Sequence, residues 1–215
     1  MALTSEEINR KLLHILSGCA IPAGILYIPY IPGAPKDLPM IILGILLVLS
    51  LMVELIRFKM PAVQKMFYRF VGSMLRSEEN KKLTGATYIY ASAFICTIIF
   101  RHRPEVSFIV LNLFILGDAV AAVVGLSIGR IKIGKKSLEG SLACFVLCLL
   151  LFFFVYPSVP LLLEPWQGRL PLMLIICTSL SITVFELVPL KFGKSFSIND
   201  NLSVPVISGL IMLAF

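Results

Sequence analysis

Long apolar segments recur along this chain, and they constrain its fold more than any other feature. A bilayer core of about 30 Å takes about 20 apolar residues as a helix. Segments close to that length are 12–31, 38–56, 84–100, 105–126, 138–156 and 170–190, with a shorter one at 202–215. Only 14% of the 215 residues are charged, too few to cover a water-soluble domain. The sequence therefore predicts an all-α polytopic membrane protein with about seven transmembrane helices, in a single integral membrane domain spanning residues 1–215.

The distribution of Lys and Arg predicts how these helices are oriented. With a cytosolic N-terminus, fifteen of the 19 Lys and Arg residues fall on the cytosolic side, and the remaining four are Lys36, Arg101, Arg103 and Arg169. This asymmetry is the positive-inside pattern of multi-pass proteins. With one span more or fewer, Lys and Arg would no longer gather on one side. The pattern therefore supports both the number of spans and their orientation.

Residues 57–76 are too polar to cross a bilayer. Val63, Phe67, Phe70 and Met74 recur at helical spacing, and the Lys and Arg residues fall largely elsewhere around the helix. The pattern predicts one amphipathic helix on the anionic cytosolic leaflet. Two roles stay open for it, a gate for lipid entry and a basic anchor at the membrane surface.

Ionisable residues inside membrane helices are functional candidates because burying an unpaired charge there is costly. Those inside the predicted spans are His14, Glu54, Asp118 and Glu186, all in the cytosolic half. Glu54 and Glu186 have an alternative structural role, pairing with Arg57 and Lys191. Asp118 has no Lys or Arg within a turn, so it is the strongest candidate.

Small residues recur every fourth position from Gly117 through Ala121 and Gly125 to Gly129. Such spacing permits close packing of two membrane helices. It also permits a ligand to approach the backbone, and periodicity alone does not separate the two interpretations.

A basic loop follows this segment and carries Arg130, Lys132, Lys135 and Lys136. Together with Gly134 and a helix that starts after Ser137, it has the ingredients of a polyphosphate site: clustered cations, a glycine turn and a helix N-terminus. It is not a Walker A loop, because Lys136 takes the Ser/Thr place and a membrane helix precedes it. Taken alone, the loop also fits ordinary positive-inside charge.

Carboxylates flank the basic loop. Asp118 precedes it, Glu139 follows it, and Asp200 opens the last loop–helix junction. Mg²⁺ prefers one or two carboxylates together with phosphate oxygens. We therefore expect a magnesium ion held by Asp118 and Glu139, with Asp200 as a third candidate ligand.

Five segments of the sequence resemble the CTP-dependent lipid kinases, the group of dolichol kinase, phytol kinase and the CTP-dependent diacylglycerol kinase of fungi. The segments are R-K-L-L-H-I-L-S-G (Arg10–Gly18), K-K-L-T-G-A-T-Y (Lys81–Tyr88), G-D-A-V-A-A-V-V-G-x-x-x-G (Gly117–Gly129), G-K-K-S-L-E-G-S (Gly134–Ser141) and D-N-L-S-V-P (Asp200–Pro205). The wider superfamily also contains the cytidylyltransferases that make CDP-diacylglycerol from phosphatidate.

The resemblance implies that CTP donates the phosphate, from a site on the loop Gly125 to Gly140, to the hydroxyl of a membrane lipid alcohol. Phytol, a polyprenol and diacylglycerol are the expected classes of acceptor. At 215 residues the chain is more similar to the compact phytol-kinase and diacylglycerol-kinase-like members than to dolichol kinase, which has extra N-terminal spans.

On these grounds we expect Lys135, Lys136 and Arg130 to bind the triphosphate, with Lys132 as a helper and Ser137 completing the cradle. The glycines assigned to the nucleotide site are Gly125, Gly129, Gly134 and Gly140.

The expected catalytic groups are Asp118, Glu139 and His14. Asp118 is the first candidate to accept the proton of the attacking hydroxyl. His14, next to Lys11, is the other candidate base, and both residues are candidates to bind the polar end of the acceptor. Asn201 is expected either to hydrogen-bond the nucleotide or acceptor, or to cap the last helix.

Two other functions compete with the lipid kinase. A phosphatidate cytidylyltransferase would keep the fold and CTP but release pyrophosphate. A transporter would use Asp118 and Glu186 as coupling sites, but the sequence has no visible repeat, and its polar residues collect at one face. No nucleic-acid partner is expected, and the sequence leaves the oligomeric state open.

Overall fold

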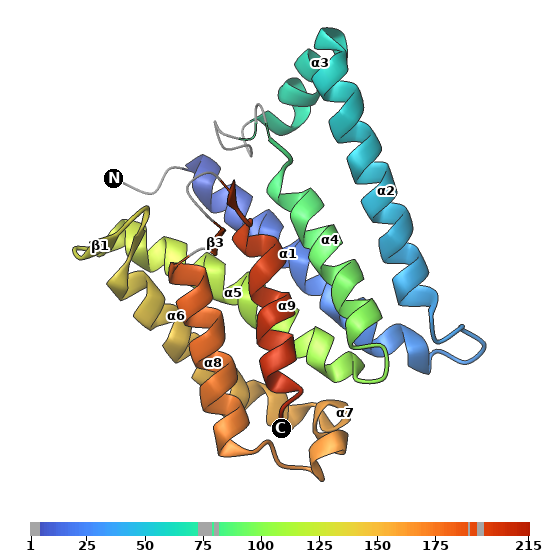
Figure 1. Ribbon diagram of the computed structural model, residues 1–215, viewed down its shortest axis with the longest axis vertical. Coiled ribbons are helices and arrows are strands. Elements are labelled where there is room, and N and C mark those ends of the chain that lie inside the picture. Colours follow the sequence, from blue (N-terminus) through green and yellow to red (C-terminus); the bar gives the residue numbers. More distant parts are fainter. Residues whose placement is uncertain (1–4, 73–78, 80–81, 189, 193–195) are drawn as a thin grey trace.

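The computed structural model describes residues 5–72, 79, 82–188, 190–192 and 196–215 (Figure 1). Most of these residues are helical. The helices are α1 (Ser5–Tyr27), α2 (Leu38–Lys59), α3 (Pro61–Val71), α4 (Gly85–Ile99), α5 (Pro104–Ser127), α6 (Leu138–Leu150), α7 (Pro160–Leu163), α8 (Leu172–Leu187) and α9 (Asp200–Met212). A π-helical segment, Leu151–Val155, continues α6, and short 3-10 turns cover Ile28–Tyr30, Tyr156–Ser158 and Glu164–Trp166.

Two small antiparallel hairpins complete the described structure, and neither was expected from the sequence. Strand β1 (Lys132–Ile133) pairs with β2 (Lys136–Ser137), placing Lys132 opposite Ser137. Strand β3 (Lys191–Phe192) pairs with β4 (Phe196–Ser197). Both hairpins lie in loops between helices, so they do not change the helical character of the bundle.

A helix lies at each of the seven predicted apolar segments. Within the described residues, 3 helices are long and apolar enough to cross a membrane: Leu38–Lys59, Pro104–Ser127 and Leu138–Ser158. Shorter apolar helical stretches are Gly18–Tyr30, Gly85–Ile99, Leu172–Leu187 and Asp200–Met212. The structure therefore confirms a mainly helical fold with 3 candidate membrane spans among the described residues. Seven complete crossings stay a prediction.

The predicted amphipathic helix corresponds to α3, which is shorter than the 57–76 segment assigned to it. Val63 and Phe67 are half-buried, whereas Phe70 is exposed. Met74 lies outside the described residues. The α3 helix therefore turns its apolar residues partly toward the protein and partly outward, as an interfacial helix would.

Helix α5 is the centre of the bundle. Half of its apolar span is buried, and it packs against α1, α6, α8 and α9. Helix α2 is at the periphery, where only 17% of its span is buried and its helical neighbours are mainly α4 and α3. The peripheral α2 is nonetheless at least as apolar as α5, as expected of a helix whose outer face meets lipid.

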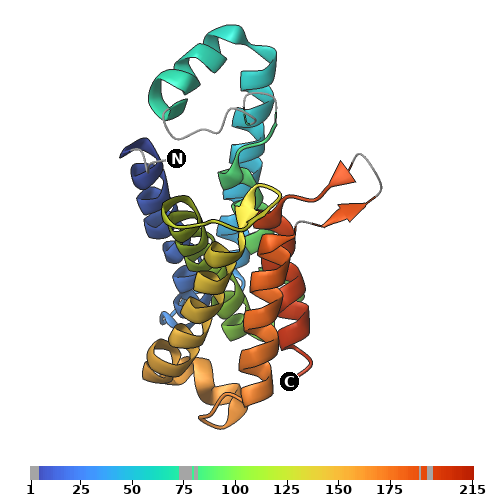
Figure 2. The same ribbon diagram turned by 90° about the vertical axis from the view of Figure 1, so that its left-hand side faces the viewer.

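The helices run alternately between two ends of the bundle. Figure 2 shows α3 and the two hairpins toward one end and the C-terminus at the other. The starts of α1, α4, α6 and α9 and the ends of α2, α5 and α8 point toward the first end (Figures 1 and 2). We call it the hairpin end, and the helix halves that carry Glu54, Asp118, Glu139, Glu186 and Asp200 are those nearest to it.

Glycines allow α5 and α6 to approach closely. A Cβ atom added to Gly140 would lie 2.5 Å from the carbonyl oxygen of Ala121, and one added to Gly117 would lie 2.7 Å from Cys144 Sγ. One added to Gly125 would lie 2.7 Å from Ser137 Oγ. Of the two interpretations of the small-residue spacing, the structure therefore supports helix packing.

The α5–α6 contact yields a stability prediction for Gly140→Ala. The new methyl group meets the backbone of Ala121, which cannot rotate away, so we expect a loss of about 1–3 kcal/mol in unfolding free energy. The control is Gly24→Ala in α1, whose Cβ would meet only Ile28 Cδ1 at 3.5 Å. Thermal unfolding in detergent micelles measures both, and equal midpoint shifts would contradict the packing role.

Candidate active site

The basic loop forms a hairpin between α5 and α6. Strands β1 and β2 pair across a turn in which Gly134 has a φ of 64°, a conformation that favours glycine. The hydroxyl of Ser137 accepts a hydrogen bond from the backbone N–H of Gly140 at 3.2 Å and so caps α6. Of the expected phosphate-binding cations, Arg130, Lys132 and Lys135 are exposed on this hairpin.

Glu139 fastens the first arm of the hairpin. Its Oε1 atom accepts the backbone N–H of Arg130 at 2.9 Å and that of Ile131 at 3.1 Å. The ammonium of Lys132 donates to the carbonyl oxygen of Gly125 at 3.2 Å, which ties the same arm to the end of α5. The carboxylate expected to hold a metal is thus engaged with loop backbone in this structure.

Lys136 connects the second arm to two helices far along the chain. Its Nζ atom lies 2.7 Å from Glu186 Oε1 and 2.8 Å from Asp200 Oδ2, and it also donates to the carbonyl oxygen of Glu186. Burial by itself would lower the pKa of Lys136, but the carboxylates of Asp200 and Glu186 outweigh it and raise that pKa above its ordinary value. Lys136 is therefore a protonated cation at neutral pH.

Glu186 pairs with Lys136, a partner that the sequence analysis did not propose. The side chain of Lys191, the expected partner, lies outside the described residues. Glu186 is almost fully buried, and its Oε2 atom has no hydrogen-bond partner among the described residues. A buried carboxylate oxygen without a donor is costly, so a donor or cation is expected beside Oε2.

Asp118 belongs to the same cluster. It is buried on α5 and lies close enough to Glu186 to interact with it electrostatically. The structure thus brings Asp118, Lys136, Glu186 and Asp200 together from α5, β2, α8 and α9. Within the described residues no group of three or more His, Cys, Asp or Glu could hold a metal unaided.

The start of α9 is joined to the start of α4. Asn201 Nδ2 donates to the carbonyl oxygen of Gly85 at 3.1 Å. Asn199, not Asn201, caps α9, because its side-chain oxygen accepts the N–H of Asn201 at 2.9 Å. Asn199 was not among the expected residues, although an Asn just before an apolar helix is a known capping signal.

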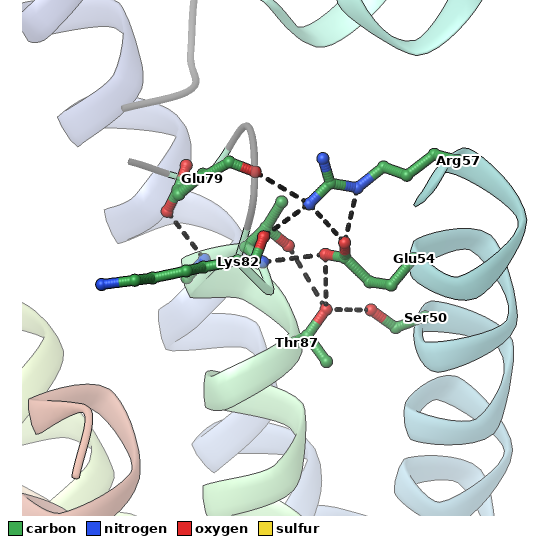
Figure 3. Close-up of polar contacts among 8 residues, drawn as sticks. Ser50, Glu54, Arg57, Glu79, Lys82 and Thr87 are labelled. Carbon is green, nitrogen blue, oxygen red and sulfur yellow. Dashed lines mark hydrogen bonds and ion pairs between the residues drawn. The ribbon is translucent and has the colours of Figure 1, made fainter. Parts of the chain in front are cut away.

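A second polar cluster surrounds Arg57 at the end of α2 (Figure 3). Arg57 is fully buried, its Nε atom lies 2.5 Å from Glu54 Oε2, and its Nη2 atom donates to the carbonyl oxygens of Glu79 at 3.0 Å and Lys82 at 2.7 Å. The expected pairing of Glu54 with Arg57 is therefore confirmed.

The other carboxylate oxygen of Glu54 reaches α4. Oε1 accepts the backbone N–H of Thr84 at 2.8 Å and the hydroxyl of Thr87 at 3.2 Å, and Thr87 also contacts the hydroxyl of Ser50 at 2.6 Å (Figure 3). The carboxylate of Glu79 in turn accepts the N–H of Gly85 at 2.9 Å. These contacts attach the otherwise peripheral α2 to the start of α4.

His14 and Lys11 lie on α1, whose start is at the hairpin end (Figure 2). Their side chains are outside the described part of the structure, so their expected contacts with the acceptor stay predictions.

Known proteins with similar sequences cover nearly the whole chain. The CTP-dependent diacylglycerol kinase 1 of Schizosaccharomyces pombe is 26% identical over 225 residues, covering 96% of this chain and 92% of that protein. The protein of the same name from Saccharomyces cerevisiae is 28% identical over 227 residues, covering 99% of this chain and 74% of that protein. An uncharacterized Rickettsia prowazekii protein is 28% identical over 204 residues, covering 93% of this chain and 90% of its own.

The chain is a relative of the CTP-dependent lipid kinases. The resemblance carried by the sequence motifs is thereby confirmed. No protein-family model matches the chain. No solved structure matches it either.

The described parts of the motifs that carry the resemblance lie toward the hairpin end. The Gly117–Gly129 and Gly134–Ser141 segments form the α5–α6 junction, and Asp200–Pro205 opens α9. The start of α4, part of another motif, is held there by the Arg57 cluster. Arg57 therefore supports the position of the start of α4 at the hairpin end.

This role of Arg57 predicts a large stability loss for Arg57→Met. The substitution leaves the Glu54 carboxylate buried without its cation, which costs about 3–5 kcal/mol in unfolding free energy. The control is Arg101→Met, which breaks an Arg101–Asp37 pair whose side chains are 56% and 38% exposed. That pair is worth less than about 1 kcal/mol. Denaturant unfolding in mixed micelles measures both, and similar losses in the two variants would refute the assignment.

Proposed function

We propose that this protein is a CTP-dependent kinase that phosphorylates the hydroxyl of a membrane lipid, with diacylglycerol as the first candidate acceptor. The observation that carries the proposal is the similarity over nearly the full chain to proteins named CTP-dependent diacylglycerol kinase. The hairpin end supports it physically, because it combines exposed cations with a buried carboxylate cluster.

The cations of the hairpin supply the triphosphate site. Phosphoryl transfer needs in-line placement of the reactants and stabilisation of charge spreading over phosphate oxygens. Arg130, Lys132 and Lys135 are exposed on one short hairpin, where their side chains are accessible to a soluble nucleotide. The N-terminus of α6 adds backbone N–H groups, whose partial positive charge attracts phosphate.

The magnesium ion expected from the sequence would take most of its ligands from the nucleotide and water, because no three carboxylates among the described residues are placed to hold it. Asp118 and Asp200 are the proposed protein ligands, together with phosphate oxygens of CTP. When bound, the ion would neutralise charge on the β- and γ-phosphates. Glu139, the other expected ligand, is assigned here to holding the hairpin, because its carboxylate accepts two backbone N–H bonds.

Asp118 is the proposed base. The lipid hydroxyl oxygen forms a bond to the γ-phosphorus of CTP while the bond from that phosphorus to the β–γ bridging oxygen breaks. The hydroxyl proton passes to the carboxylate of Asp118 and then to solvent, and the products are a phosphorylated lipid and CDP.

The proposed active side is the cytosolic one, following the positive-inside pattern. The acceptor would lie among the helices with its hydroxyl at the hairpin end, where α1 carries Lys11 and His14 (Figure 2). These two residues are the proposed contacts for the polar end of the acceptor, and His14 is the alternative base. Asn201 is retained as a positioning group between α9 and α4.

The overall reaction is tested with γ-labelled CTP and purified protein in mixed micelles containing diacylglycerol, phytol or a polyprenol. We expect label in the lipid, most strongly with diacylglycerol, and none with γ-labelled ATP at the same concentration. Phosphatidate is included as a fourth lipid. Label released as pyrophosphate with phosphatidate would instead identify a cytidylyltransferase.

The role of Asp118 predicts that Asp118→Asn lowers kcat by about 10²–10⁴-fold, the contribution typical of a positioned general base. The amide keeps the size of the side chain but cannot accept the proton. Asp37→Asn at the opposite end of the bundle is the control and should retain nearly full activity. Normal turnover by a folded Asp118→Asn protein would remove Asp118 from the mechanism.

A further inference from the structure

The ammonium of Lys136 has no donor left for a phosphate in this structure. A lysine ammonium carries three N–H donors. Here three oxygens surround it: the carbonyl and carboxylate oxygens of Glu186 and one carboxylate oxygen of Asp200. A phosphate oxygen would have to displace one of these partners.

The surroundings of Lys136 favour retention of those partners. Its side chain is only 26% exposed, and that of Glu186 is 3% exposed. Removing the ammonium would leave a buried carboxylate without a cation, a far larger cost than that of breaking a surface pair. Arg130, Lys132 and Lys135, by contrast, are exposed on the same hairpin.

Some side chains of the hairpin contact only its flanking helices, and one contacts helices far along the chain. Those of Glu139 and Lys132 lie within residues 125–139 and hold the hairpin to its own flanking helices. The contacts of Lys136 reach residues 50 and 64 positions further along, at the end of α8 and the start of α9. Lys136 therefore sets where the hairpin stands relative to Glu186 and Asp200.

We infer that Lys136 is a positioning residue that latches the basic hairpin to α8 and α9, with Glu186 and Asp200 as its anchors. The triphosphate charge is then carried by Arg130, Lys132 and Lys135. This inference rests on the proposed function for its catalytic meaning, and it replaces the expectation that Lys136 binds the triphosphate directly. The latch itself is a property of the nucleotide-free protein.

The test is a double-mutant cycle with Lys136→Met, Glu186→Gln and the double variant, measured without nucleotide. Hydrogen exchange of the hairpin amides, residues 128–137, is followed in purified protein. We expect each single variant to speed exchange by about tenfold, within the range of coupling between contacting residues, and the double variant to add little. Lys136→Arg, which keeps a cation in place, should restore much of the protection.

Arg130→Met is the matched control, since it removes a cation from the same hairpin at an exposed position. It should leave amide exchange unchanged and weaken CTP binding. The latch is overturned if Lys136→Met leaves exchange unchanged and lowers CTP affinity as much as Arg130→Met does. It is also overturned if the effects of Lys136→Met and Glu186→Gln on exchange simply add.

The exchange measurement separates this inference from the proposed function. If the double-mutant cycle shows coupling between Lys136 and Glu186 but the protein transfers no phosphate from CTP, the latch is upheld and the proposed kinase function is refuted. Phosphate transfer by a protein whose exchange cycle shows no coupling would uphold the kinase and refute the latch.

Discussion

The architecture of the hairpin end depends on two clusters of buried charged residues that join helices. An unpaired charge in an apolar bundle is costly, so the partners that Arg57, Glu54 and Lys136 require also connect separate elements. Arg57 and Glu54 attach α2 to α4, and Lys136 attaches the α5–α6 hairpin to α8 and α9. The hydrogen bond from Asn201 to Gly85 lies between the two clusters and joins α9 to α4.

This arrangement meets two different requirements of a phosphate-transfer site. A site for a soluble triphosphate needs cations that the nucleotide can reach, whereas carboxylates that hold a metal or accept a proton need fixed positions. Here the exposed cations stand on a two-stranded hairpin, and the carboxylates of Asp118 and Glu186 are buried in the helices beneath. The fixed part is supplied by helix packing, in which Gly117 and Gly140 let α5 and α6 approach closely.

The sequence predicted the helices well and their connections poorly, for a physical reason. Apolar runs must form helices in a membrane, since only a helix satisfies its own backbone there. The ends were less accurate: α1 already begins at Ser5 and α2 continues to Lys59, because charged residues at helix ends can reach the interface while their backbone stays helical. The Glu54–Arg57 pair was predictable because its residues lie one turn apart. The Glu186–Lys136 pair was not, because it depends on tertiary packing between residues 50 positions apart.

The roles of the lysines in the basic loop also depend on tertiary contacts that the sequence does not show. Some of them anchor the loop, and others are proposed to bind phosphate. A lysine that anchors a loop and a lysine that binds phosphate both place a cation beside anionic oxygens. The sequence alone therefore does not distinguish them. Burial distinguishes them: Lys136 faces carboxylates inside the protein, and Arg130 and Lys132 are exposed. The small-residue spacing was ambiguous in the same way, and the close contact of Gly140 with Ala121 accounts for it by packing. The kinase assignment therefore rests on the relatives and on the exposed cations beside buried carboxylates, and the nucleotide contacts expected of Gly125, Gly129, Gly134 and Gly140 stay a prediction.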